Sequence, residues 1–143
     1  THNEMTRFWI LLEESVYFVI NSLKKMQGGE IFVPKIPSIN ILDLAKAIGP
    51  NCKIKVTGIR PGEKLHEEMI TEDASLNTLE NKHYYIILPM TDKKTQNLYL
   101  KKFKAKKVKH RFSYNSYENK KFLKVNEIRD LINKNLTPKL KPV

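Results

Sequence analysis

Strand-like and helix-like patterns alternate along residues 1–90, and this alternation constrains the fold more than any other feature of the sequence. Apolar residues recur at three- and four-residue steps between residues 12 and 26, which predicts an amphipathic helix that Gly28 and Gly29 end. A second helix is predicted at residues 41–48, with Asn40 as its N-cap. Periodicity and composition further predict strands at residues 6–10, 31–33, 54–59 and 83–88, a short helix at 64–69, and a polar loop at 71–79. Strands alternating with helices indicate an α/β unit.

The charge of the chain changes abruptly near residue 90. Residues 1–90 carry 10 basic and 11 acidic side chains, whereas residues 91–143 carry 16 basic and 4 acidic ones. We therefore predict two parts, a lobe at residues 1–90 and a lysine-rich extension at residues 91–143. Apolar residues at helical spacing predict that the extension ends in a helix at about residues 122–136; they are Phe122, Val125, Ile128, Ile132 and Leu136.

The lysine-rich extension permits several interpretations. Lysines interleaved with Tyr99, Phe103 and Phe112 could follow a nucleic-acid backbone with some stacking on the bases. They could also rest on anionic lipid. A solvated lysine-rich surface is the interpretation we favour, because no recognised nucleic-acid module accompanies the lysines. Nucleic acid is therefore not expected as a partner.

Apolar runs, cysteine content and histidine spacing give expectations for the cellular location and for metal binding. No apolar run approaches the ~18–20 residues that span a bilayer, and residues 1–8 lack the pattern of a secretory signal. The single cysteine, Cys52, allows no internal disulfide, so we expect a cytoplasmic protein in which Cys52 is buried. His66 has Ile70 four residues later in place of a second metal ligand, and no metal site is predicted.

The stretch GIRPGEKLHEEM at residues 58–69 carries the first candidate binding residue. If residues 54–59 form a strand and residues 64–69 a helix, Arg60 projects from the strand's carboxyl end, where open α/β sheets place their ligands. Gly62 allows close approach of the backbone, and the N–H groups that open a helix favour an anion. A pyrophosphate suits the planar fork of arginine. The alternative is that Arg60 pairs with Glu63 or Glu67 on the surface.

Arg7, in the stretch MTRFW, is the second candidate. It could meet Arg60 across one cleft, or it could lie on the surface over neighbouring aromatic side chains. Spacing alone does not decide between these two placements.

Two longer stretches show a resemblance to a known family. They read EMTRFWILLEESVYFVINSLKKMQGGEIFVPKIPSINILDLAKAI and GIRPGEKLHEEMITEDASLNTLENKHYYIILP, and together they run from Glu4 to Pro89. They closely resemble the carboxy-terminal, substrate-binding part of the inverting UDP-N-acetylglucosamine 4,6-dehydratases, which belong to the extended short-chain dehydrogenase/reductase superfamily and act in bacterial polysaccharide biosynthesis. The sequence departs from the family pattern at Leu11, where a threonine N-cap is expected.

The resemblance implies a two-lobed, homo-oligomeric enzyme. One lobe is a Rossmann domain that holds NADP, and the smaller lobe, to which most of this chain corresponds, binds the UDP-sugar. It further implies that Arg7 and Arg60 face the nucleotide phosphates, and that Glu63 lies toward the ribose or uracil. Met5 and Thr6 are expected to line the same cleft.

The family's catalytic parts are absent from the sequence. No glycine-rich dinucleotide fingerprint occurs, and the one Tyr-x-x-x-Lys match, Tyr117 to Lys121, lies in the lysine-rich extension and is interpreted as a coincidence. We therefore expect a fragment that binds no cofactor, has no catalytic residues of its own, and depends on a Rossmann lobe in cis or in trans. A related UDP-sugar 4-epimerase is the alternative parent enzyme, and a non-enzymatic basic binding module is the alternative from another class.

Overall fold

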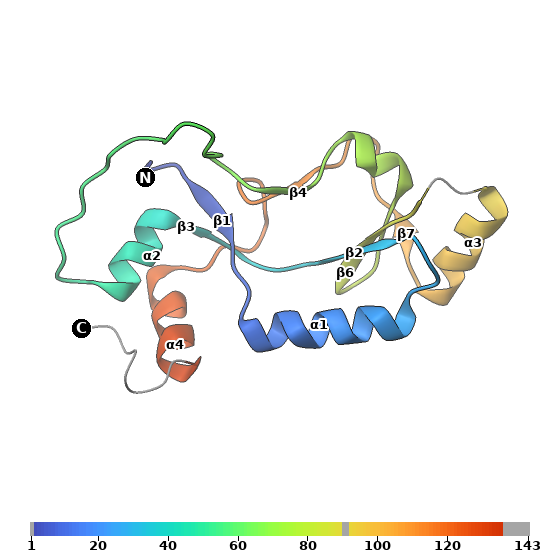
Figure 1. The fold of residues 1–143 in the computed structure, drawn as a ribbon, viewed down its shortest axis with the longest axis horizontal. Coiled ribbons are helices and arrows are strands. Elements are labelled where there is room, and N and C mark those ends of the chain that lie inside the picture. Colours follow the sequence, from blue (N-terminus) through green and yellow to red (C-terminus); the bar gives the residue numbers. More distant parts are fainter. Residues whose placement is uncertain (1, 90–91, 136–143) are drawn as a thin grey trace. The chain divides into compact units, whose positions relative to one another are not determined.

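A computed structural model describes residues 2–89 and 92–135 of the chain (Figure 1). The contacts divide it into two compact units, each assembled from segments that are distant in sequence. Among the described residues, the first unit contains residues 2–9, 37–67 and 115–135, and the second contains residues 10–36, 68–89 and 92–114. Each unit therefore draws on both sides of residue 90. The functional division at that residue stays a prediction.

The first unit is built on a pair of short antiparallel strands. β1 (Thr6–Phe8) pairs with β3 (Ser38–Asn40), with Thr6 opposite Asn40. α2 (Ile41–Ile48) begins directly after β3, because the side-chain oxygen of Asn40 accepts a hydrogen bond of 2.8 Å from the backbone N–H of Leu42. The predicted strand, helix and N-cap are confirmed here, whereas β3 was not predicted.

Two helices enclose the core of the first unit. α4 (Val125–Asn135) packs against α2, and the predicted terminal helix is thus confirmed with a start three residues later; Leu136 lies outside the described residues. The apolar positions that predicted α4 face this core, since Ile128 and Ile132 are buried in it. Burial of each such side chain stabilises the fold by about 1.5–3 kcal/mol. The buried cluster consists of Ile39, Ala47, Leu123, Ile128 and Ile132.

A four-stranded antiparallel sheet forms the centre of the second unit. Its strand order is β2-β6-β5-β7, with β2 at Ile31–Pro34, β6 at Tyr84–Ile87, β5 at Thr78–Glu80 and β7 at Lys106–Lys107. The predicted strands at residues 31–33 and 83–88 are confirmed. The predicted polar loop is wrong, because a 3-10 helix at Asp73–Asn77 and strand β5 occupy it.

The lysine-rich segment contributes a helix, α3 (Lys93–Lys102), to the second unit. Its aromatic side chains face the core: Tyr99 is 6% exposed and Phe103 is 8% exposed, and their rings stack with centroids 5.7 Å apart. These two rings are therefore unavailable for stacking on nucleic-acid bases. The buried cluster of this unit consists of Leu79, Ile86, Leu88, Tyr99 and Phe103.

A buried carboxylate links α3 to the turn before β2. Glu30 accepts hydrogen bonds from the backbone N–H of Gln27, from that of Gly28 at 2.7 Å, and from the hydroxyl of Tyr99 at 3.1 Å. Burial by itself would raise the pKa of Glu30, but these donors outweigh it and hold the pKa below its usual value. Glu30 is therefore ionised and fully engaged at neutral pH.

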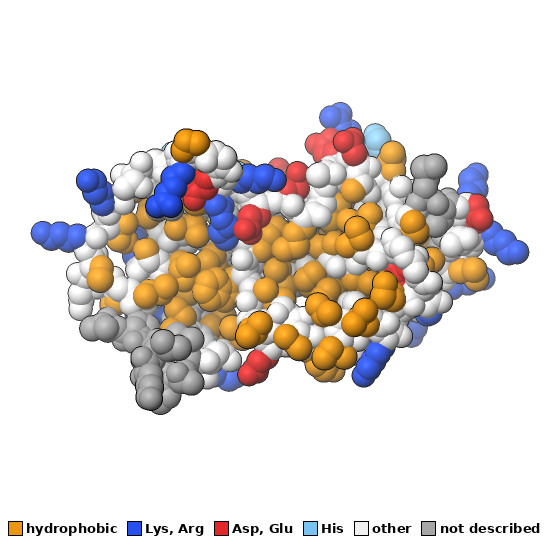
Figure 2. Space-filling view, in the orientation of Figure 1, with side chains coloured by type: hydrophobic (Ala, Val, Ile, Leu, Met, Phe, Trp, Pro, Cys, Tyr) orange, Lys and Arg blue, Asp and Glu red, His pale blue; other side chains and the backbone are white. Residues whose placement is uncertain are grey.

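The first helix of the chain, α1 (Leu12–Lys25), forms as predicted but leaves its apolar face uncovered. Leu12 is 78% exposed and Leu23 is 62% exposed. Hydrophobic side chains gather on the surface over α1 in the space-filling view (Figure 2). We call this surface the α1 face; it consists of Leu12, Val16, Val19, Ile20 and Leu23.

Three predictions about residues 50–70 are wrong. Residues 54–59 form no strand, and residues 64–69 form no helix; β4 (Glu68–Ile70) lies there and pairs with β8 (Tyr114–Asn115). Cys52 is exposed rather than buried. The alternating residues Ile54, Val56 and Ile59 are each more than two-fifths exposed, because no described strand pairs with this segment.

Candidate functional site

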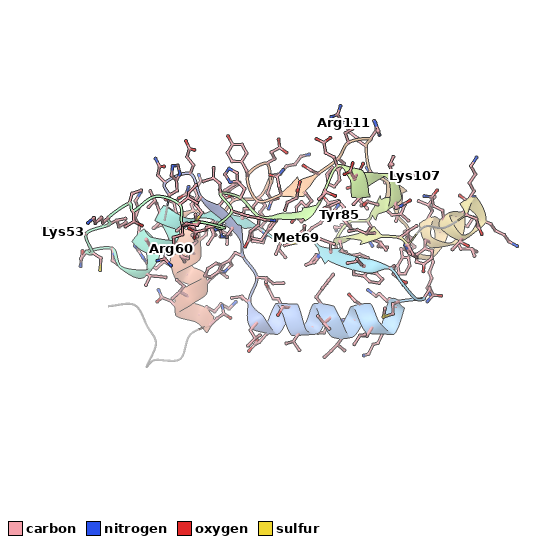
Figure 3. All side chains as sticks on the ribbon, turned by 45° about the horizontal axis from the view of Figure 1, so that its top comes forward. Lys53, Arg60, Met69, Tyr85, Lys107 and Arg111 are labelled. Atoms are coloured by element: carbon pink, nitrogen blue, oxygen red, sulfur yellow. The ribbon has the colours of Figure 1, made fainter. Side chains whose placement is uncertain are left out.

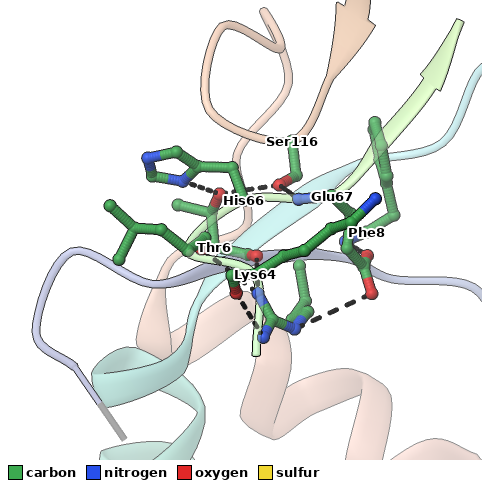
Figure 4. Close-up of polar contacts among 8 residues, drawn as sticks. Thr6, Phe8, Lys64, His66, Glu67 and Ser116 are labelled. Carbon is green, nitrogen blue, oxygen red and sulfur yellow. Dashed lines mark hydrogen bonds and ion pairs between the residues drawn. The ribbon is translucent and has the colours of Figure 1, made fainter. Parts of the chain in front are cut away.

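Strand β1 and residues 64–67 lie side by side in the first unit, and Arg7 joins them (Figure 4). The Nη1 atom of Arg7 donates to the carbonyl oxygens of Thr6 at 2.7 Å and Leu65 at 3.2 Å. Its Nη2 atom donates to the carbonyl oxygen of Lys64 at 2.9 Å. Arg7 therefore acts as a clamp on the backbone, and one N–H of Nη2 remains available.

Glu67 completes the clamp from the other side. Its carboxylate accepts a hydrogen bond of 2.8 Å from the backbone N–H of Phe8 and lies 3.7 Å from Nε of Arg7. The backbone N–H of Thr6 also donates to the carbonyl of Leu65 at 3.1 Å. These contacts hold residues 64–67 extended, which explains why the helix predicted from local spacing does not form.

Thr6 belongs to a buried chain of hydroxyl groups. Its Oγ1 lies 2.7 Å from Oγ of Ser116 and 2.8 Å from Nδ1 of His66. Ser116 is fully buried, and its hydroxyl accepts a hydrogen bond of 2.9 Å from the backbone N–H of Glu67. The ring of His66 packs against Tyr117, with centroids 4.6 Å apart. Thr6 therefore fixes the position of His66 and does not itself face solvent.

Met5 is a core residue in this structure. Its side chain is 2% exposed, and its carbonyl accepts a hydrogen bond of 3.0 Å from the backbone N–H of Ile41. Met5 thus supports the start of α2. The expectation that its side chain lines a cleft stays a prediction.

Arg60 and Glu63 form a small turn of their own. The carboxylate of Glu63 accepts a hydrogen bond of 3.2 Å from the backbone N–H of Arg60. In return, the backbone N–H of Glu63 donates a hydrogen bond of 3.0 Å to the carbonyl of Arg60. Gly58 and Gly62, on either side, have φ angles of 82° and 79°, which disfavour other residues. Arg60 lies on the extended segment that follows α2 (Figure 3). No strand precedes it and no helix follows it, so the geometry predicted for Arg60 is wrong.

The two arginines have different environments. Arg7 is 22% exposed with its donors largely engaged, whereas Arg60 is exposed and its guanidinium has no hydrogen-bond partner among residues 2–89 and 92–135. The alternative interpretation was that Arg60 pairs with Glu63 or Glu67 on the surface. Glu63 does contact Arg60, but it accepts a hydrogen bond from the backbone N–H of Arg60 and not from the guanidinium. An exposed guanidinium with five free donors can bind an oxyanion bidentately.

Sequence reasoning missed one residue of this site. Ser116 stands in an unremarkable polar stretch, and no local pattern links it to Thr6, 110 residues earlier. His66, for which the sequence predicts no metal role, contacts Thr6 and Tyr117. Within the described part of the chain, no three His, Cys, Asp or Glu side chains gather as a metal site, and no helix there is long and apolar enough to cross a membrane.

Comparison with known proteins gives a consistent result. The profile of the family described as "Polysaccharide biosynthesis protein" matches residues 1–89. A UDP-N-acetylglucosamine 4,6-dehydratase (inverting) of Campylobacter jejuni is 46% identical over 137 residues, which cover 93% of this chain and 41% of the relative. A UDP-glucose 4-epimerase of Rickettsia canadensis is 34% identical over 138 residues, which cover 92% of this chain and 39% of that protein.

A solved structure agrees in fold. The X-ray structure of Pen from Bacillus thuringiensis matches with a TM-score of 0.74 and 31% identity, over 94% of this chain and 40% of that one. The chain spans about two fifths of the length of the curated relatives and of the solved structure.

Proposed function

Because the chain belongs to the polysaccharide biosynthesis protein family, we propose that it is the UDP-sugar-binding portion of an inverting UDP-N-acetylglucosamine 4,6-dehydratase. The identity of 46% to the Campylobacter dehydratase, against 34% to the Rickettsia epimerase, supports this choice. The observation that carries the proposal is the contrast between the two arginines: Arg7 fixes the backbone of the site and Arg60 presents a free guanidinium.

In this proposal the diphosphate of the nucleotide sugar is held mainly by Arg60. Arg7 contributes its remaining Nη2–H, and its main effect is to position residues 64–67. Glu63 shapes the turn that presents Arg60 and lies toward the ribose or uracil. Met5 and Thr6 support the site from buried positions at the start of β1. The binding residues are therefore Arg7, Arg60 and Glu63, supported by Met5 and Thr6.

The reaction of the whole enzyme removes water from C6 of the sugar and yields a 4-keto-6-deoxy product for a surface polysaccharide or a flagellin glycan. NADP supplies the transient oxidation and re-reduction when bound. The 143 residues contain no dinucleotide fingerprint, so we propose that NADP and the catalytic residues reside on a Rossmann lobe, in cis or in trans. We expect no turnover of UDP-N-acetylglucosamine by this chain with NADP alone. The free thiol of Cys52 suits a reducing compartment, and we place the enzyme in the cytoplasm.

The α1 face gives the missing lobe a place to pack. Its five apolar side chains form one stripe, and large exposed stripes of this kind mark interaction sites. We propose that the Rossmann lobe covers it in the whole enzyme, which we expect to be a homo-oligomer. Without that lobe, the chain should self-associate. The double variant Val16→Lys/Leu23→Lys should reduce the weight-average mass in sedimentation equilibrium, whereas Lys24→Gln/Lys25→Gln should not.

The test of ligand binding is a titration with UDP and with uridine, followed by Trp9 fluorescence or calorimetry. We expect weak, saturable binding of UDP, weaker than micromolar, because half of the cleft is absent. Binding of uridine should be weaker still, since it lacks the diphosphate. Arg60→Ala should weaken UDP binding about tenfold, the value of one charge-assisted bidentate contact. Equal affinity of UDP for the wild type and for Arg60→Ala would exclude Arg60 as the phosphate ligand.

A UDP-sugar 4-epimerase is the second candidate, because the Rickettsia relatives match the chain over 92% of its length. The two activities differ in their products. The whole enzyme should release a 4-keto-6-deoxy sugar detectable by mass loss of one water, whereas an epimerase would give a product of unchanged mass.

A further inference from the structure

A pocket in the second unit contains neither Arg7 nor Arg60 and is lined mainly by lysines. Its volume is about 360 Å³, within the range of small-molecule sites. Three segments form it: the end of β2, the turn between β5 and β6, and the link from α3 to β7. The lining residues are Lys35, Glu80, Asn81, Lys82, Lys104, Ala105 and Lys106. Four ammonium groups thus surround a single carboxylate.

The one carboxylate is already neutralised. Glu80 lies 3.1 Å from Nζ of Lys35 and 3.2 Å from Nζ of Lys106. Burial alone would raise the pKa of Glu80, but the hydrogen bonds and charges of these two lysines lower it, so Glu80 stays ionised at neutral pH. Lys35 is also held by the carbonyl of Asn81 at 2.6 Å and lies over the ring of Tyr85 at 4.5 Å. These contacts hold Lys35 in place, and this part of the wall carries more positive than negative charge.

Lys82 and Lys104 supply the unpaired charge. Both are exposed, and neither side chain has a hydrogen-bond or ion-pair partner within the described part of the chain. A ligand that enters the pocket therefore meets two free ammonium groups in addition to Lys106, which is 79% exposed. This group of positive charges favours the binding of a multiply charged anion.

The backbone at Lys104 gives a second, independent indication. The N–H of Ala105 donates to the carbonyl of Leu100 at 3.0 Å, and the N–H of Lys104 donates to that of Lys101 at 3.3 Å. This pair of bonds ends α3 in a Schellman motif, whose left-handed residue is usually glycine. Here Lys104 occupies it with φ of 46°, although a side chain is unfavourable there. A lysine held in a disfavoured conformation at the rim of a basic pocket suggests selection for its charge.

We propose that this basic pocket binds a phosphate-bearing anion, separately from the proposed UDP-sugar site. Lys82 and Lys104 contact the phosphate oxygens directly, and Lys106 shares its charge between the ligand and Glu80. Asn81 has a positioning role: its side-chain oxygen accepts hydrogen bonds of 2.9 Å from the N–H groups of His83 and Tyr84 and so fixes the turn that carries Lys82.

The experiment is a titration of the ¹⁵N-labelled chain with inorganic pyrophosphate at low salt, followed by amide chemical shifts. We expect the signals of Lys82, Lys104 and Ala105 to move together and to saturate, with affinity falling steeply as salt rises. The variant Lys82→Gln/Lys104→Gly should weaken this binding about tenfold or more. Glycine is the residue that the left-handed conformation at position 104 favours, so we expect this variant to stay folded and loss of binding to report the lost charge.

Three results would overturn the proposal. The first is the absence of a saturable shift at these amides in the wild type. The second is equal loss of affinity in the control Lys94→Gln/Lys101→Gln, which removes two charges from exposed positions of α3 outside the pocket. The third is loss of the shifts at residues 82 and 104 in Arg60→Ala, which would tie them to the UDP-sugar site. A titration with adenosine diphosphate in place of pyrophosphate tests whether the ligand is a free phosphoanion or a nucleotide. Equal affinity assigns the site to the phosphoanion alone, and tighter binding of adenosine diphosphate assigns it to a nucleotide.

Discussion

Replacing Arg7 by lysine tests the assignment of this residue as a clamp. The guanidinium makes three hydrogen bonds to backbone carbonyls, at 2.7, 2.9 and 3.2 Å, and its side chain is 22% exposed. A lysine ammonium keeps the charge but can reach at most one of these carbonyls, so about two bonds are lost. Hydrogen bonds to charged donors contribute about 1.5–3 kcal/mol each, and partial exposure favours the low end. Arg7→Lys should therefore lower the free energy of unfolding by about 2–3 kcal/mol.

The assay is urea unfolding followed by far-UV circular dichroism, with Arg129→Lys as the matched control. Arg129 makes one long hydrogen bond of 3.4 Å, to the carbonyl of Lys46 in the same unit, so its replacement should cost less than about 0.5 kcal/mol. The ion pair of Arg7 with Glu67 adds little, because Glu67 is 44% exposed and lies at 3.7 Å. The clamp assignment fails if Arg7→Lys costs no more than Arg129→Lys.

The remaining predictions concern buried hydrogen bonds and pH. Ser116→Ala should lower the free energy of unfolding by about 1–3 kcal/mol, because it removes one partner of Thr6 and leaves the N–H of Glu67 without its side-chain acceptor. Ser15→Ala should cost less in the same urea assay, because among the described residues the hydroxyl of Ser15 bonds only to the carbonyl of Leu12 in its own helix. Tyr99→Phe should cost about 1–2 kcal/mol at pH 7 through the lost bond to Glu30. The pKa of Glu30 is lowered in the folded state, so its contribution is present above the unfolded-state pKa of about 4.5 and is lost as pH falls through the lower folded-state pKa. Urea midpoints at pH 7 and pH 3 should accordingly differ less in Tyr99→Phe than in the wild type; an unchanged pH dependence would contradict this role of Tyr99.

Local patterns predicted three helices, whose hydrogen bonds are local, and two strands with strong apolar runs. α1, α2 and α4 follow from apolar periodicity, and the N-cap at Asn40 follows from its residue type. The strands at β2 and β6 follow from short apolar runs closed by proline. Periodicity could not show that the apolar face of α1 remains exposed, because the pattern is the same whether a face covers its own core or another lobe.

The errors arise where distant segments decide the conformation. Residues 64–67 have helical spacing, but Arg7 and Ser116 capture their carbonyl and N–H groups and hold them extended. Residues 54–59 alternate like a strand, yet no described strand pairs with them. In α3 the lysines concealed the helix, because Tyr99 is the buried residue within it and Phe103 follows as its C-cap. Arg7 and Arg60 were singled out from their local sequence, and the family resemblance supported them; their unequal environments required the structure.

The most direct test of the central claim is a map of UDP on the ¹⁵N-labelled chain. The account predicts that amides in two segments, residues 58–63 and residues 64–67 beside β1, shift together with one common dissociation constant. It also predicts that Arg60→Ala raises this dissociation constant about tenfold at both segments without unfolding the chain. Saturable shifts confined to residues outside both segments, or an unchanged dissociation constant in Arg60→Ala, would contradict the assignment of this site to a nucleotide sugar.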